Sequence, residues 1–385
     1  MLTSTSAGPA LLPVYGTFPL RAASGHGSWL VDEDGLEWLD AYGGHAVASS
    51  GHSHPDVVAA IADQAARLLF YSTAVPHAGR EQLAETLAQL SPEPLEKVFF
   101  CNSGAEANEN QLGLARRKTG RTQVISMLGG WHGRTAATLA CTDGAKYEAG
   151  ARRAGMPLSI RVPFNDIAAL EAAMNDTIAA VLLEPVQGFQ GARSATPEFL
   201  RAARALCDQH GAKLLFDEVQ CGVGRLGTFT AAEFFGVVPD ALSMAKGLAA
   251  GLPIGAVLAV PSLVDDIKVG DLGSTFGGGP VVCAAALANI SVLERESLLE
   301  NVRDVSARIT SVAATLPHVV RVHGHGFLLG LELDRPAAEV QRALWGHRIL
   351  TGTSTDPMTL RLLPPLSFSA DEAGLLLAGL REVLQ

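Results

Sequence analysis

The stretch KLLFDEVQ, residues 213–220, joins a short apolar run to two acids and a glutamine. Residues 213–216 have the length and composition of a buried strand, and Asp217 follows at its end. A second stretch, SMAKGLAAGLPIG at residues 243–255, places Lys246 at the head of a glycine-rich segment. Buried strands that end in polar residues are typical of open sheets, whose ligands gather at the carboxyl ends of the strands.

Strand-like and helical patterns alternate through the middle of the chain. The predicted strands are residues 97–100, 123–127, 179–183 and 213–216, and the predicted helices are residues 105–117 and 197–210. Such alternation predicts an α/β fold with a large, mostly parallel sheet covered by helices on both faces. Polar motifs follow these strands directly, at residues 102–104, 129–132, 184–185 and 217.

The pattern changes near Cys283. Long amphipathic stretches follow at residues 284–299 and 302–316, and a strand-like run at residues 327–333. We therefore predict a large domain over residues 46–284 and a smaller α+β domain over residues 285–385.

Composition limits the class of protein. A chain of 385 residues, 48% of them hydrophobic and 18% charged, with 40 glycines, is typical of a soluble α/β enzyme. The net charge of −10 argues against a nucleic-acid partner, and no apolar run approaches the roughly 18 residues of a membrane span. Residues 1–13 do not have the pattern of a signal peptide, so we expect a cytoplasmic protein.

Neither cysteines nor histidines predict a metal site. The five cysteines are scattered and have no CxxC spacing, which favours buried free thiols. Two histidine pairs, His52 with His54 and His323 with His325, have no accompanying cluster of Cys, Asp or Glu. Turn or core histidines are the better interpretation.

Lys246 and Asp217 together indicate a specific chemistry. A lysine among small and apolar residues can be partly desolvated, which lowers the pKa of its amine and lets it form a Schiff base with a carbonyl. An acid at the mouth of a buried strand can hold a pyridine nitrogen protonated. Pyridoxal 5'-phosphate (PLP) needs both groups. Either residue alone would more simply be a buried acid or a surface lysine.

The motifs FDEVQ (216–220), GVGR (222–225), PD (239–240) and AKG (245–247) resemble the signature of the class III, ornithine-type, aminotransferases. The resemblance extends from about residue 25 to about residue 367, and within the family it is strongest to the acetylornithine aminotransferases. It implies the fold type I architecture of PLP-dependent transferases, with residues 1–45 packing against the small domain, and Lys246 as the catalytic lysine.

The resemblance also implies a cofactor site. Ser103, Gly104 and Ala105 lie at the start of a predicted helix, whose N-terminal N–H groups suit a phosphate, although Asn-Ser-Gly alone is more often a helix cap. The remaining cofactor-binding residues by resemblance are Trp131, which would stack on the ring, Asp217 and Val219, Gln220, which would donate to the phenolic oxygen, and Thr275.

Substrate-binding residues come from the same resemblance. Arg134 aligns with an arginine that holds a substrate carboxylate, a role that suits its planar fork of donors. The other positions are Glu184, Ser274 and Arg361, although an acid such as Glu184 can also simply cap the next turn. In the family, the segment that contains Thr275 reaches the partner's cofactor, which implies a homodimer.

One departure from the family concerns Phe189. Relatives that act on a terminal amino group usually carry an acid at this position, and there it pairs with the arginine that Arg361 matches. Phe189 cannot form such a pair. Either another acid masks Arg361, or Arg361 stays available to α-carboxylates.

The expected reaction transfers the terminal amino group of N-acetylornithine, or of a similar ω-amino acid, to 2-oxoglutarate, in arginine biosynthesis. A competing hypothesis is the matching step of lysine biosynthesis, whose substrate is carried by an acidic protein. The chain could also be another ω-amino acid aminotransferase, an isomerase of the same fold, or a PLP-binding relative that does not transaminate.

Overall fold

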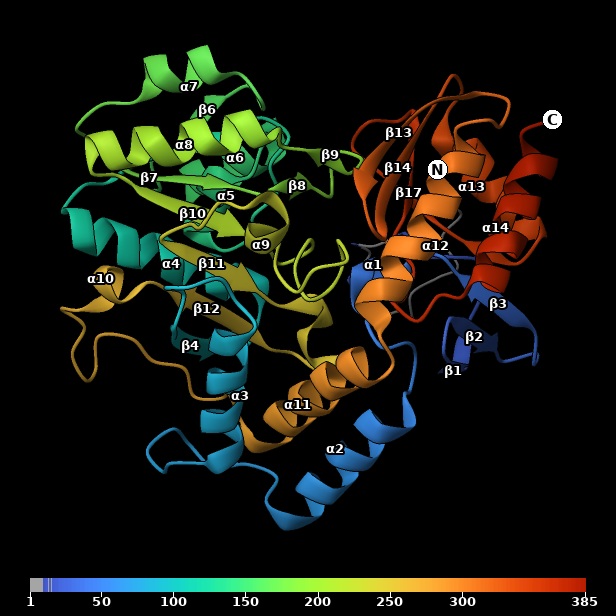
Figure 1. The fold of residues 1–385 in the computed structure, drawn as a ribbon, viewed down its shortest axis with the longest axis horizontal. Helices are drawn as coiled ribbons and strands as arrows, with labels where there is room; N and C mark the ends of the chain where they lie inside the picture. Colours follow the sequence, from blue (N-terminus) through green and yellow to red (C-terminus); the bar gives the residue numbers. More distant parts are fainter. Residues whose placement is uncertain (1–9, 13, 15) are drawn as a thin grey trace.

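The computed structural model describes residues 10–12, 14 and 16–385. Its centre is a seven-stranded sheet, on the left in Figure 1. The strands, in spatial order, are β4 (Lys97–Cys101), β12 (Gly255–Ala259), β11 (Ala241–Met244), β10 (Lys213–Asp217), β7 (Ile178–Leu183), β5 (Gln123–Met127) and β6 (Ile160–Val162). All neighbouring pairs are parallel except those of β12, which is antiparallel to both β4 and β11. The predicted α/β fold with a mostly parallel sheet is confirmed.

Helices cover the sheet because its strands are apolar on both faces: every residue of β7 is buried. Helices α4 and α8 pack on the central strands, and both begin at a hydroxyl cap and end at a left-handed glycine. The helices of this part are α3 (Ala78–Gln89), α4 (Gly104–Thr119), α5 (Ala136–Cys141), α6 (Ala145–Arg153), α7 (Ile167–Ala173), α8 (Pro197–His210), α9 (Ala231–Phe235) and α10 (Pro261–Val264), with a short 3-10 helix η1 (Lys246–Ala249).

The C-terminal part builds a second, antiparallel sheet, on the right in Figure 1. Its strands are β13 (Val319–His325), β14 (Leu328–Leu333), β17 (Thr359–Leu362) and β16 (Gly352–Thr353), accompanied by α12 (Leu298–Ala313), α13 (Ala337–Gly346) and α14 (Ala370–Val383). A third sheet joins β1 (Ala22–His26), β2 (Trp29–Asp32) and β3 (Glu37–Asp40) to β15 (Ile349–Leu350). The parallel pairing of β3 with β15 ties the N-terminal strands to the C-terminal part.

The predicted boundary between residues 284 and 285 falls inside a helix. Helix α11 (Pro280–Arg295) crosses it without a break and packs on α2 (Pro55–Arg67) and α3. Of the predicted N-terminal segment 1–45, residues 1–9, 13 and 15 lie outside the described residues. The division into three parts stays a prediction.

Other sequence expectations can be compared directly. All five cysteines are buried and none forms a disulfide. Each of the predicted histidine pairs has at least one member bonded to a carboxylate, His52 to Asp40 at 2.8 Å and His323 to Glu332 at 2.7 Å. Within the described residues there is no helix long and apolar enough to cross a membrane.

Two glycines allow the polar loops to lie close to the sheet edge. A methyl group on Gly255 would sit 2.3 Å from the Ser103 carbonyl oxygen, and one on Gly104 would sit 2.7 Å from Val219. The start of β12, the start of α4 and the turn after β10 can therefore touch only because these positions lack a side chain.

This packing can be tested by a matched pair of substitutions. Gly255→Ala should lower the free energy of unfolding by about 1–3 kcal/mol, because its methyl group must displace backbone. Gly113→Ala is the control, since nothing lies within 4 Å of its added methyl and it is exposed in α4. It should raise stability by up to about 1 kcal/mol. Urea denaturation measures both, and a neutral Gly255→Ala would contradict the account.

Candidate active site

Asp217 ends β10 and is buried at the carboxyl edge of the sheet. Its Oδ2 accepts hydrogen bonds from Asn108 Nδ2 at 2.7 Å and from His132 Nδ1 at 2.8 Å. Its Oδ1 accepts one from the Val219 backbone N–H at 3.1 Å. Three separate elements thus converge on one carboxylate, which satisfies the requirement that a buried charge be hydrogen-bonded.

Lys246 opens η1, directly after β11, with a left-handed φ of 41°. Burial is the main cause that lowers the pKa of its amine, and the nearby positive charge of Arg361 lowers it further, against the opposing effects of Asp217 and Glu184. Among the described residues, none accepts a hydrogen bond from Nζ. An amine with a lowered pKa and no internal partner is suited to act as a nucleophile or a base.

Glu184 is buried directly after β7, near enough to both Asp217 and Lys246 for their charges to affect its pKa. Its Oε1 accepts the Trp131 backbone N–H at 2.8 Å, and its Oε2 accepts the Gly188 N–H at 3.3 Å. Burial, helped by the charge of Asp217, raises the pKa of Glu184 to about 7. This acid therefore holds two loops of the site by their backbones.

Arg361 projects from β17 and is only 2% exposed. It donates to the Thr353 carbonyl at 2.7 Å, the Gly188 carbonyl at 3.1 Å and the Tyr42 hydroxyl at 3.1 Å. Its guanidinium also lies over the Phe189 ring, 5.1 Å from the centroid. No carboxylate of the described part of the chain lies within 4 Å of the guanidinium, which favours the second of the two alternatives, an Arg361 that stays available to a carboxylate.

Phe189 also stacks on Trp131, with ring centroids 4.5 Å apart and planes 25° from parallel. The Arg134 guanidinium lies over the Trp131 ring, 5.2 Å from its centroid. A pair of stacked aromatic rings therefore carries one arginine on each member, Arg134 on Trp131 and Arg361 on Phe189.

The start of α4 lies beside this centre. Ser103 is the N-cap and accepts the Glu106 N–H at 3.2 Å, while Gly104 packs directly against Val219. Ala105 packs against Gly133, since a methyl group added to Gly133 would lie 2.7 Å from the Cβ of Ala105. The helix N-terminus and the turn after Asp217 are thus adjacent.

Gln220 packs on the second loop of the site. Its side chain occupies the space beside Gly188, and its Nε2 donates to the His45 carbonyl at 3.4 Å.

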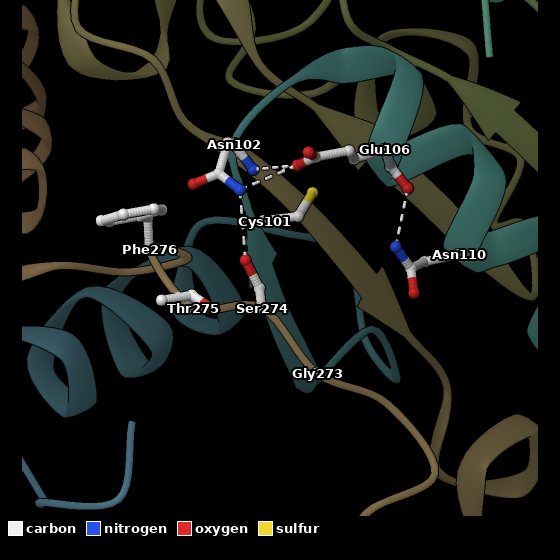
Figure 2. Close-up of a pocket in the computed structure, with 8 residues that line it drawn as sticks. All are labelled: Cys101, Asn102, Glu106, Asn110, Gly273, Ser274, Thr275 and Phe276. Atoms are coloured by element: carbon white, nitrogen blue, oxygen red, sulfur yellow. Dashed lines mark hydrogen bonds between the residues drawn. The ribbon is translucent and has the colours of Figure 1, made fainter. Parts of the chain in front are cut away.

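Ser274 and Thr275 lie elsewhere, in the surface pocket of Figure 2. The pocket has a volume of about 350 Å³ and is also lined by Cys101, Asn102 and Phe276. Ser274 Oγ accepts from Asn102 Nδ2 at 3.2 Å, whereas Thr275 is exposed. Among the described residues, neither Ser274 nor Thr275 forms a hydrogen bond with Lys246 or Asp217.

Several residues of the site were not predicted from the sequence. Tyr42 and His45 flank Arg361: the Tyr42 hydroxyl is 2.6 Å from His45 Nδ1, and both residues line a cavity of about 230 Å³ with Arg361. His45 has a left-handed φ of 67°. The Gly43-Gly44 pair before it was the available signal, because glycines mark a turn of positive φ. Asn108 and His132 were also missed.

Comparison with known proteins identifies the family. The family profile "Aminotransferase class-III" matches residues 13–384. The chain belongs to the class III aminotransferases. A relative named acetylornithine aminotransferase 1, from Bordetella parapertussis, is 42% identical over 94% of this aminotransferase and 94% of its own length. An acetylornithine aminotransferase of Methanocaldococcus jannaschii is 38% identical over 97% of this chain and 95% of its own.

Solved structures share the fold. The ornithine aminotransferase of Toxoplasma gondii superposes with a TM-score of 0.90 at 28% identity, covering 97% of this chain and 92% of its own. A PLP-bound amine transaminase from an uncultivated Pseudomonas species has a TM-score of 0.88 at 27% identity, covering 99% of both chains. This class III aminotransferase is therefore PLP-dependent.

The side chains of this aminotransferase fit PLP chemically. The aldehyde of PLP reacts with an uncharged amine, and burial lowers the pKa of the Lys246 amine. Its pyridine nitrogen pairs with a carboxylate, and Asp217 is a buried carboxylate held by neutral donors and a histidine. Its phosphate suits the N–H groups that begin α4.

The titration of Glu184 gives a pH-dependent prediction. Its pKa in the folded chain, about 7, lies above the ordinary value of 4.5, so the folded state binds the proton more tightly. The stability that this proton contributes is complete below about pH 4.5 and is lost as pH rises to 7. Over that range, cofactor-free wild type should lose up to about 3 kcal/mol more unfolding free energy than Glu184→Gln.

Urea denaturation of both proteins across this pH range measures the difference. Glu171→Gln, at an exposed position of α7, is the matched control and should follow the wild type. Parallel profiles for wild type and Glu184→Gln would show that Glu184 does not titrate in this way.

Proposed function

We propose that this aminotransferase moves the terminal amino group of N-acetylornithine, or of a similar ω-amino acid, to 2-oxoglutarate. The products are the semialdehyde and glutamate, as in arginine biosynthesis. The names of the relatives support this choice. The observation that carries it is the pair of arginines on the Trp131–Phe189 stack, because glutamate and 2-oxoglutarate each present two carboxylates.

PLP, when bound, supplies an electron sink for the substrate carbon that carries the amino group. We assign Asp217 to its ring nitrogen, Gln220 to its phenolic oxygen and Trp131 to the face of its ring. Ser103, Gly104 and Ala105 would hold the phosphate, with Val219 packed beneath them against Gly104.

Lys246 would be both the anchor and the base. Because burial lowers its pKa, Nζ loses its charge more readily than an ordinary lysine amine and would take a proton from the substrate carbon. Asp217 and Glu184 oppose that shift, so the charge that Nζ gains with the proton is stabilised by two nearby acids. The same atom would hold that proton until it is returned as a general acid.

Arg134 and Arg361 would bind substrate carboxylates. Arg361 is buried without an acid in contact, and a bound carboxylate would compensate its charge with two parallel hydrogen bonds. Arg134 is exposed at the other end of the aromatic pair and suits the second carboxylate. Glu184 orients the loops that carry Trp131 and Phe189, and Ser274 is assigned to the substrate that enters from the partner side.

The assembly we propose is a homodimer in which Thr275 completes the partner's cofactor site. Thr275 is exposed beside an apolar surface, formed by Leu69, Phe70, Tyr71 and Phe276, whose exposed fractions range from 40% to 69%. Phe70 and Phe276 are in contact, with ring centroids 5.1 Å apart. Such a surface favours burial against a second copy.

Mixing two inactive variants tests the lysine and the dimer together. Lys246→Ala should lose turnover and the visible absorbance of bound cofactor, whereas Lys97→Ala, at an exposed lysine, should keep both. Random mixing of Lys246→Ala with Thr275→Ala makes half of the dimers hybrids, each with one intact site. About a quarter of wild-type activity should return. If the mixture has only the mean activity of the two separate variants, the active site is not shared between subunits. If Lys246→Ala is active, Lys246 does not anchor the cofactor.

Phe189 cannot form an ion pair with Arg361, so no acid at this position blocks Arg361 from binding a substrate carboxylate. An acid at this position would have to release Arg361 before a substrate carboxylate could bind, whereas the Phe189 ring only contacts the guanidinium face. We therefore expect glutamate to bind Arg361 without breaking an ion pair.

Phe189→Glu should create that ion pair and slow the glutamate half-reaction relative to the N-acetylornithine half-reaction by at least about tenfold. Single-turnover rates with each donor give the ratio. Phe189→Leu is the matched control, because it removes the ring without adding charge, and should change the ratio much less. An unchanged ratio in Phe189→Glu would make Phe189 a packing residue only.

A further inference from the structure

Asn108, in the second turn of α4, is 1% exposed and uses all of its hydrogen-bonding capacity. Its Nδ2 donates to Asp217 Oδ2 at 2.7 Å and to the His132 carbonyl at 2.8 Å. Its Oδ1 accepts from Ser243 Oγ at 2.7 Å and from Gln111 Nε2 at 2.8 Å. An amide has two donor hydrogens and two acceptor lone pairs, so none remains unused.

These partners fix which way the amide points. A flipped Asn108 would place its oxygen 2.7 Å from a carboxylate oxygen and 2.8 Å from a carbonyl oxygen, and neither of these can donate. The amide nitrogen must therefore face Asp217.

These hydrogen bonds leave the two carboxylate oxygens of Asp217 with different capacities to accept a further donor. Oδ2 accepts the Asn108 N–H and lies 2.8 Å from His132 Nδ1, so both of its lone pairs are used when His132 carries its hydrogen on Nδ1. The Ser243 hydroxyl is 3.5 Å from Oδ1 but gives its hydrogen to Asn108 at 2.7 Å. Apart from that long contact, the donor to Oδ1 among the described residues is the Val219 N–H, at 3.1 Å, so Oδ1 keeps acceptor capacity for a further donor.

We propose that Asn108 is a positioning residue that holds Asp217 as a charged acceptor for the ring nitrogen of PLP, with Ser243 fixing the amide of Asn108. The inference rests on the assignment of Asp217 to that nitrogen proposed above. Asn108 acts through Asp217, so its effect depends on the ring nitrogen and vanishes when that nitrogen is replaced.

The test compares two ligands. PLP and an analogue with carbon in place of the ring nitrogen are titrated into cofactor-free protein, and the ratio of their dissociation constants is measured. Asn108→Asp keeps the side-chain size but sets a second carboxylate oxygen against Asp217 Oδ2. Two carboxylates at that distance share a proton, so Asp217 loses part of its charge.

Wild type should bind PLP more tightly than the analogue, and Asn108→Asp should lose at least about tenfold of that preference. Asn301→Asp is the matched control, because the Asn301 amide also donates to two acceptors, the Leu366 and Phe368 carbonyls, away from Asp217. It should keep the wild-type preference. Ser243→Ala, a milder change, should lose a smaller part of it, which provides a second measurement if Asn108→Asp does not fold.

The proposal is overturned if Asn108→Asp weakens the binding of PLP and of the analogue equally, because Asn108 then has only a structural role. If Asn108→Asp does not fold, an unchanged preference for PLP in Ser243→Ala overturns it. Asp217→Asn separates the two assignments. If it abolishes the preference while Asn108→Asp preserves it, only the role of Asn108 is wrong. If it preserves the preference, Asp217 does not meet the ring nitrogen, and both assignments fail.

Discussion

A single buried carboxylate, that of Asp217, constrains the architecture around it. A buried charge is costly unless it is hydrogen-bonded, and the donors here come from α4 through Asn108, from the loop after β5 through His132, and from the backbone after β10. These elements must meet at one edge of the sheet. The close contact of Gly104 with Val219 brings the helix start to the same place. The acid that we assign to the ring nitrogen of PLP and the helix N-terminus that we assign to its phosphate are therefore positioned together.

Local features were predictable from sequence, and features that depend on tertiary contacts were not. Strand β5 and helix α8 have the predicted bounds, 123–127 and 197–210, because composition and caps define them locally. The antiparallel direction of β12 could not be predicted, since no local pattern encodes strand direction. Ser243 was missed, although a serine inside the buried strand β11 is a polar residue that needs a partner. The ring stack of Trp131 on Phe189 joins segments almost sixty residues apart and also required the structure.

Arg361 is a buried cation without a carboxylate in contact among the described residues. A buried guanidinium normally needs a counter-charge, yet this one is held by two carbonyls, a hydroxyl and two aromatic faces. Burial accordingly lowers its pKa. Tyr42 and Phe189 contact the guanidinium of Arg361 without adding a negative charge, and we propose that a bound carboxylate supplies that charge.

The most direct test of the account is the protonation state of the bound cofactor. Wild-type enzyme loaded with PLP that carries ¹⁵N at the ring nitrogen reports that state through its nitrogen chemical shift. If Asp217 is held as a charged acceptor, the shift should be that of a protonated pyridine at neutral and mildly alkaline pH, and it should move to the neutral value in Asp217→Asn. A neutral nitrogen in the wild-type enzyme would contradict the central role of Asp217.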